Sequence, residues 1–141
     1  MFLDASAIVA ILAREPDAAR FKKAIDVARP PLCVSPLTVY EASVSLARAK
    51  IGPRAKRHPM PNEIRAAGSV VEAFIAANGV QQIAITPDIA RGAVEAAATY
   101  GKVIGHAADL NFGDCFTYAC AKAHGLPLLY KGNDFAKTDL A

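Results

Sequence analysis

Four acidic residues lie in or beside apolar segments of the chain: Asp4, Glu41, Asp114 and Asp134. A carboxylate buried without a partner is expensive, so four of them in such surroundings need partners. A hard divalent cation is one partner that could satisfy all four together. Oxygen ligands without an accompanying set of histidines or cysteines favour Mg²⁺ or Mn²⁺ over Zn²⁺. The acidic residues therefore predict a magnesium or manganese site.

Each acid also has an ordinary structural explanation. Asp4 is placed to cap a following helix, and Glu41 completes a capping-box pattern that begins at Thr38. Asp114 is favourable at a helix N-terminus through the helix dipole, and Asp134 suits a turn. For any acid taken singly, such an explanation is at least as good as a functional one. The occurrence of all four favours a shared site.

Glu41 is the hardest of the four to explain structurally. Ser35-Pro36 is a stronger helix start than the capping-box threonine, because serine caps helices and proline suits the first helical position. With that start, Glu41 lies on the same helical face as Leu37 and Val44. A carboxylate on that face points at the core or at a cleft beside it.

The composition predicts one compact domain over residues 1–141. Hydrophobic residues make up 53% of the chain and the mean hydropathy is +0.23, which argues against disorder. No apolar stretch is long enough to span a membrane, and the N-terminus lacks the basic lead of a signal peptide. Cys33, Cys115 and Cys120 form no CxxC pair, so we expect a reduced, cytoplasmic protein.

Short predicted strands alternate with helices along the chain. Strands are expected at residues 2–4, 32–34, 82–85 and 127–130. Helices are expected at residues 6–12, 16–28, 36–50, 61–78, 87–100 and 112–124, with a loop at 102–111. This alternation predicts an α/β fold in which a short parallel sheet is flanked by helices on both faces.

The predicted sheet has an edge at which the acids can meet. Ligands of parallel α/β sheets bind outside the carboxyl ends of the strands. Asp4 ends the first strand and Asp134 follows the last, while Glu41 lies on the helix after the second strand. Asp114 opens the helix that leads to the last strand, and it joins the others if that helix begins at the same edge.

A basic cluster follows the helix that contains Glu41. It comprises Arg48, Lys50, Arg54, Lys56 and Arg57. Basic side chains at a helix end and loop can contact phosphates. A solvated surface turn explains the cluster equally well, and a formal net charge of only +3 does not separate the two interpretations.

Four blocks of the sequence surround the four acids. They are Met1-Phe2-Leu3-Asp4-Ala5-Ser6-Ala7-Ile8, Thr38-Val39-Tyr40-Glu41-Ala42, Leu110-Asn111-Phe112-Gly113-Asp114-Cys115-Phe116-Thr117-Tyr118-Ala119 and Tyr130-Lys131-Gly132-Asn133-Asp134-Phe135. These blocks resemble the signature motifs of PIN-domain ribonucleases, and in particular the VapC toxins of bacterial type II toxin–antitoxin modules. They span nearly the whole chain in the expected order, and the last two are the specific ones.

The resemblance implies a PIN fold and an endoribonuclease that depends on Mg²⁺ or Mn²⁺, with transfer or ribosomal RNA as the expected substrate. It implies that Asp4, Glu41, Asp114 and Asp134 form the metal site. We expect Asp4 and Asp114 to bind the ion directly, and the other two to bind it directly or through water, or to orient the nucleophile. Loss of cleavage on neutralising Asp4 is the corresponding expectation.

Supporting residues and partners are implied in the same way. Ser6 matches a small hydroxyl residue that orders the site in the family, and Asn133 is expected to support it. The resemblance also implies a toxin homodimer and a VapB-type antitoxin that inserts a segment near the site. An antitoxin helix could dock on exposed members of an apolar set that we otherwise expect to pack the core: Ile8, Ile11, Leu12 and Phe21.

Asp109 departs from the family pattern, since relatives carry an apolar residue at this position. We expect an exposed loop residue here, although Asp109 could instead add charge at the rim of the site. A catalytically silent PIN-fold module that binds RNA or a partner is the alternative function, and a DNA nuclease is a third. A haloacid-dehalogenase-type phosphatase would need an aspartate where Ser6 stands, so we set it aside.

Overall fold

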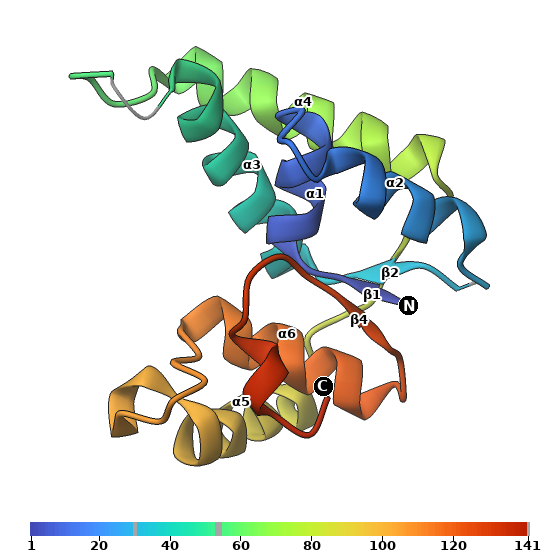
Figure 1. The fold of residues 1–141 in the computed structure, drawn as a ribbon, viewed down its shortest axis with the longest axis vertical. Coiled ribbons are helices and arrows are strands. Elements are labelled where there is room, and N and C mark those ends of the chain that lie inside the picture. Colours follow the sequence, from blue (N-terminus) through green and yellow to red (C-terminus); the bar gives the residue numbers. More distant parts are fainter. Residues whose placement is uncertain (30, 53–54, 141) are drawn as a thin grey trace.

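The computed structural model describes residues 1–29, 31–52 and 55–140. At its centre is a four-stranded parallel sheet with the order β3-β2-β1-β4 (Figure 1). The strands are β1 (Phe2–Leu3), β2 (Cys33–Val34), β3 (Gln81–Gln82) and β4 (Leu128–Leu129). The helices are α1 (Ala5–Leu12), α2 (Ala18–Val27), α3 (Pro36–Ile51), α4 (Pro61–Ala77), α5 (Pro87–Tyr100) and α6 (Phe112–Ala123), with the short 3-10 helices η1 (Lys102–Ile104) and η2 (Phe135–Lys137).

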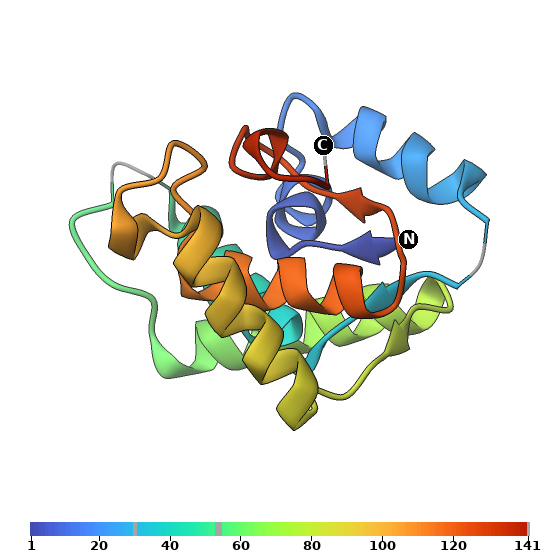
Figure 2. The same ribbon diagram turned by 90° about the horizontal axis from the view of Figure 1, so that it is seen from below.

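Alternating side chains of the strands divide the core into two layers. Phe2 and Cys33 pack with residues of α5 and α6, whereas Leu3 and Val34 pack with residues of α1, α3 and α4. Successive residues of a strand face opposite sides of a sheet, so two-residue strands are enough to anchor both layers. Figure 1 shows α1 to α4 above the sheet and α5 and α6 below it, and Figure 2 shows the lower helices in front of the strands. The predicted α/β fold with helices on both faces is therefore confirmed.

Local capping signals set the helix that contains Glu41. Ser35 is the N-cap of α3, since its hydroxyl accepts from the backbone N–H of Thr38 at 3.1 Å, and Pro36 is the first helical residue. This start, predicted from Ser35-Pro36, removes Glu41 from the capping-box position. The same kind of start, with Thr86 as the cap, opens α5.

Most predicted boundaries are within one residue of those observed, and the larger differences are at α2, β3 and the loop at 102–111. α2 begins at Ala18 rather than at Pro16, because Asp17 takes the N-cap position and Pro16 lies in the preceding turn. β3 ends at Gln82, although the N–H of Ile83 still donates to a carbonyl of β2 at 2.9 Å before the chain leaves the sheet edge. The loop expected at 102–111 contains η1 and is closed by a bridge between its two ends.

The apolar residues of the first two helices mostly pack the core, as expected. Ile8 and Phe21 are 0% and 1% exposed, while Ile11 and Leu12 are partly buried against the same clusters. Val27, the last residue of α2, is by contrast 72% exposed. All three cysteines are buried and free, and no helix among the described residues is long and apolar enough to cross a membrane.

Candidate active site

Three of the four predicted acids line one pocket at the carboxyl end of β1, which we call the acidic pocket. Asp4 approaches it from the end of the strand, Glu41 from α3 and Asp114 from the first turn of α6. The pocket has a volume of about 350 Å³. Its other lining residues are Ala5, Ser6, Val9, Glu15, Ser45, Asn111 and Lys131.

Asp4 is held by hydrogen bonds to both of its carboxylate oxygens. As the N-cap of α1, its Oδ2 accepts from the backbone N–H of Ser6 at 2.8 Å and from the Ser6 hydroxyl. Its Oδ1 accepts from the Thr117 hydroxyl at 3.1 Å. Asp4 is only 6% exposed, and these donors, together with the positive end of α1, offset the cost of burying it. The capping role of Asp4 and its place in the pocket are thus compatible.

The Ser6 hydroxyl links Asp4 to the segment after β4. It donates to Asp4 and accepts from the backbone N–H of Lys131 at 2.9 Å. Because β1 and β4 are neighbours in the sheet, this bond ties the ends of two adjacent strands together beside the acids. Ser6 therefore holds Asp4 and the segment after β4 relative to one another.

Glu41 is pressed against the start of α6. A β-carbon at position 113 would overlap both carboxylate oxygens of Glu41, so the carboxylate fills space that Gly113 leaves open. Burial raises the pKa of Glu41 to about 7, and the negative charges of Asp4 and Asp114 add to the rise. In the absence of a cation, Glu41 therefore holds its proton to a higher pH than an ordinary glutamate does.

Asp114 takes part in a helix cap and also lines the pocket. Its Oδ2 accepts from the backbone N–H of Asn111 at 2.8 Å, and the Asn111 Oδ1 accepts from the N–H of Asp114 at 3.1 Å. Burial raises the pKa of Asp114 to about 6, although the bond from Asn111 acts in the opposite direction. Three nearby negative charges add to the rise in this pKa, those of Asp4, Asp134 and Asp109.

Asp134 lies at the edge of the acidic cluster rather than in the pocket. It is exposed, immediately precedes η2 and is not among the residues that line the pocket. Its negative charge nevertheless contributes to the raised pKa of Asp114. The neighbouring Asn133 is exposed, and its backbone carbonyl accepts from the N–H of Ala136 at 3.1 Å, as in a turn.

Asp109 combines the two roles considered for it. It is an exposed loop residue with a left-handed backbone (φ 55°), and its carboxylate lies 3.4 Å from the ammonium group of Lys102. Its negative charge also contributes to the raised pKa of Asp114. The residue therefore adds charge near the pocket without entering it.

Two residues of the site were missed in the sequence. Thr117, which is 2% exposed, lies one turn after Asp114 on α6, and the i, i+3 spacing places both on one helical face. The sequence offered one sign of this role, since Thr117 shares a helical face with the acidic residue Asp114. Gly113 lies inside the first turn of the same helix, where glycine is unfavourable, and this is a sign that another group approaches closely.

The basic cluster extends away from the acidic pocket along α3 and beyond its end. Arg48 lies one helical turn after Ser45, which lines the pocket. Arg48, Lys50 and Lys56 are exposed. Arg57 is exposed as well, but both of its terminal nitrogens donate to the Glu63 carboxylate at 2.7 Å, which fixes the start of α4. Arg54 lies outside the described residues.

The chemistry of the acidic pocket suits a hard divalent cation. Carboxylates, hydroxyls and an amide supply oxygen ligands around it. The raised pKa values of Glu41 and Asp114 reflect mutual repulsion as well as burial, and a cation would relieve that repulsion. Within residues 1–29, 31–52 and 55–140, no three His, Cys, Asp or Glu side chains are already spaced to hold one ion. An ion held by one or two of these carboxylates and by water would not need such a cluster.

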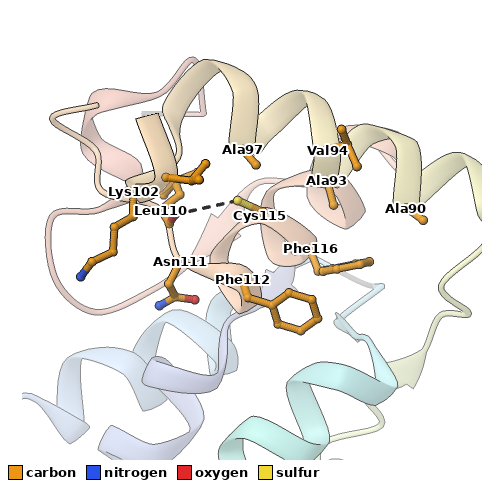
Figure 3. A pocket seen from close by; sticks show the side chains of 11 residues that line it. Ala90, Ala93, Val94, Ala97, Lys102, Leu110, Asn111, Phe112, Cys115 and Phe116 are labelled. Atoms are coloured by element: carbon orange, nitrogen blue, oxygen red, sulfur yellow. Dashed lines mark hydrogen bonds between the residues drawn. The ribbon is translucent and has the colours of Figure 1, made fainter. Parts of the chain in front are cut away.

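An apolar groove lies beside the acidic pocket, between α5, η1 and α6 (Figure 3). Its volume is about 700 Å³, and Asn111 lines both the groove and the acidic pocket. Val94, Val103 and Phe112 are 66%, 82% and 68% exposed. The other lining residues are Ala90, Ala93, Ala97, Lys102, Leu110, Cys115 and Phe116.

Comparisons with known proteins give the family. The PIN domain model matches residues 1–140, and the chain belongs to the PIN domain family. Its curated relatives include VapC ribonuclease R02377 of Rhizobium meliloti (strain 1021), which is 45% identical over 139 residues, 99% of this chain and 98% of the relative. Ribonuclease VapC30 of Mycobacterium tuberculosis is 37% identical over 141 residues, 100% of this chain and 96% of the relative.

A solved structure shows the same fold. The crystal structure of Mycobacterium tuberculosis VapC20, described as a Sarcin-Ricin loop cleaving toxin, matches with a TM-score of 0.67 at 19% identity and covers 96% of this chain and 92% of that chain. Together with the family match and the full-length VapC relatives, this confirms the resemblance to PIN-domain VapC proteins that the sequence blocks predict.

Proposed function

We propose that the protein is a single-domain, cytoplasmic endoribonuclease of the VapC toxin type, and that it hydrolyses RNA phosphodiesters with Mg²⁺ or Mn²⁺ at the acidic pocket. The observation that supports this most strongly is the convergence of Asp4, Glu41 and Asp114 on one pocket, in a chain homologous to ribonucleases over its full length. Transfer or ribosomal RNA is the proposed substrate class.

Each acid has a distinct place in this proposal. Asp4 and Asp114, which protein hydrogen bonds already fix, would hold the ion directly. Glu41 and Asp134 would hold it directly or through water, or orient the attacking water. When bound, the ion would lower the pKa of a water molecule and neutralise the negative charge that develops on the phosphate. Thr117 and Ser6 keep Asp4 in place through their hydrogen bonds to its carboxylate. The exposed residues of the basic cluster would hold the RNA backbone.

Cleavage of RNA by the purified protein tests this proposal. The wild type is expected to cleave total transfer RNA or ribosomal RNA in Mg²⁺ or Mn²⁺ and to stop when EDTA is added. Asp4→Asn, which keeps one oxygen for the α1 cap, should abolish cleavage while remaining folded. RNA binding without cleavage by the wild type in either metal would instead identify a catalytically silent module.

We also propose two protein partners, a VapB-type antitoxin and a second copy of this chain. The apolar groove is the surface we assign to the second copy, because exposed apolar patches mark interaction sites and a two-fold interface pairs a patch with itself. Lys102 is the only charged side chain among the described residues that line it. Val94→Asp should convert a dimer to a monomer in light scattering. A dimer that persists in this variant would place the interface elsewhere.

A further inference from the structure

Lys131 brings a positive charge to the acidic pocket. It is the only cationic side chain among the described residues that line this pocket, and four carboxylate-bearing residues line the same space: Asp4, Glu15, Glu41 and Asp114. Its backbone N–H donates to Ser6, so the residue is anchored directly beside Asp4. Figures 1 and 2 show the segment after β4, in red, passing beside α1, in blue.

The ammonium group of Lys131 is paired with the turn between α1 and α2. It forms an ion pair with Glu15 and lies 3.4 Å from the Oδ1 of Asp17. The ammonium donates a hydrogen bond to Glu15, while the buried Asp17 oxygen, which accepts no hydrogen bond from the described residues, attracts the ammonium through its charge. The side chains of Lys131 and Glu15 are 39% and 30% exposed. Partly exposed pairs of this kind contribute little stability, so another anion can compete for the lysine.

RNA entering the acidic pocket would bring such an anion. A phosphodiester beside carboxylates is repelled unless cations compensate it. A divalent ion compensates part of that charge, and an ammonium at the pocket wall compensates more. We propose that Lys131 is a phosphate-binding residue, whose ammonium leaves Glu15 and pairs with the RNA phosphate that enters the acidic pocket. This inference rests on the proposed ribonuclease function and deepens it.

Two substitutions that break the same ion pair distinguish phosphate binding from a purely structural clamp. Lys131→Met removes the cation, whereas Glu15→Gln removes one of the two carboxylates that compete for it and leaves Asp17 in place. The probes are a mixed-sequence single-stranded oligoribonucleotide and total transfer RNA, bound in Ca²⁺ and followed by fluorescence anisotropy across a salt series. Lys131→Arg keeps the charge, and Lys122→Met breaks an exposed pair with Asp139 outside the acidic pocket, which makes it the matched control.

Phosphate binding predicts opposite effects of the two substitutions. Lys131→Met should reduce the salt slope for the oligoribonucleotide by about 0.7, the loss of one phosphate contact, and weaken binding roughly fivefold at about 0.1 M salt. Glu15→Gln should bind RNA as tightly as the wild type or more tightly, and Lys131→Arg and Lys122→Met should retain the wild-type slope. An unchanged slope in Lys131→Met, or equal losses in Lys131→Met and Glu15→Gln, would overturn the inference alone. A wild type that neither binds nor cleaves RNA would overturn the proposed function as well.

Discussion

The carboxylate of Glu41 occupies the space that a β-carbon at position 113 would fill. Gly113 is part of the first turn of α6, one residue before Asp114, so the absence of a side chain there lets α3 bring an acid against the helix that supplies another. The pocket therefore needs Gly113 because glycine has no side chain, and not because glycine makes the backbone flexible.

Gly113→Ala should displace Glu41 without unfolding α6. Alanine is favoured over glycine in a helix interior by about 1 kcal/mol, so the helix should persist while the added methyl group expels the carboxylate from its place. We expect RNA cleavage and Mn²⁺ affinity to fall at least tenfold, roughly the effect of disturbing a ligand's surroundings. Cleavage rates and calorimetry measure the two losses.

The control is another helical glycine. Gly68 of α4 has only the Ser43 side chain near its missing β-carbon, at 3.7 Å, so Gly68→Ala should leave cleavage unchanged. In a Glu41→Ala background, Gly113→Ala should cause no further loss, because the clashing group is gone. Additive losses in that double variant would contradict the steric explanation.

Thr117→Val tests the support of Asp4. The substitution keeps the size of the side chain but leaves the buried Asp4 Oδ1 without its hydroxyl donor. The free energy of unfolding should fall by about 1–2 kcal/mol, and cleavage should fall by about 10–100-fold. Urea denaturation and initial cleavage rates provide the measurements. Thr117→Ser should restore both, whereas a fully active Thr117→Val would show that Asp4 needs no such support.

Glu41 also predicts how pH affects the metal-free protein. Its pKa in the folded state, about 7, lies above the ordinary value of 4.5. Between pH 4.5 and pH 7, the folded protein therefore keeps a proton on Glu41 that the unfolded chain has already released. The contribution of Glu41 to the free energy of unfolding therefore decreases as pH rises through this window. Glu41→Gln should be more stable than the wild type at pH 7.5 by roughly 1–3 kcal/mol, with little difference at pH 4.5. Thermal melts in EDTA over this range would detect the effect, and parallel curves for the two proteins would contradict it.

The basic cluster predicts a change in salt dependence. Replacing Arg48, Lys50 and Lys56 together by glutamine should weaken RNA binding and lower its salt slope, since each lost phosphate contact to a single strand removes about 0.7 from the slope. Arg57→Gln should mainly reduce stability, because its guanidinium is engaged with Glu63. A triple variant with the wild-type slope would leave these residues as a solvated surface.

The fold was predictable because its signals are local. Ser35-Pro36 and Thr86-Pro87 fix two helix starts, and alternation of strands and helices predicts the parallel sheet. The ends of β3 were harder to predict, because a strand of two residues at a sheet edge has almost no periodicity of its own.

The meeting of Asp4, Glu41 and Asp114 at one sheet edge was predictable, as was a supporting role for Ser6, but the contacts of Thr117 and Gly113 were not. The bond from Thr117 to Asp4 joins residues 113 positions apart, and the fit of Glu41 against Gly113 depends on how α3 and α6 pack. Such contacts belong to the tertiary structure, and local sequence patterns do not encode them. The placement of Asp134 outside the pocket likewise depends on the path of the chain after β4.

Calorimetric titration of partner-free protein with Mn²⁺, for the wild type and Asp114→Asn, tests the metal site most directly. Asparagine at position 114 still offers an oxygen to the backbone N–H of Asn111, so α6 should keep its cap and circular dichroism should show a folded variant. The account predicts binding by the wild type and at least a tenfold weaker affinity in the variant. Equal Mn²⁺ affinity in the two proteins, or no binding by the wild type with or without RNA, would contradict it.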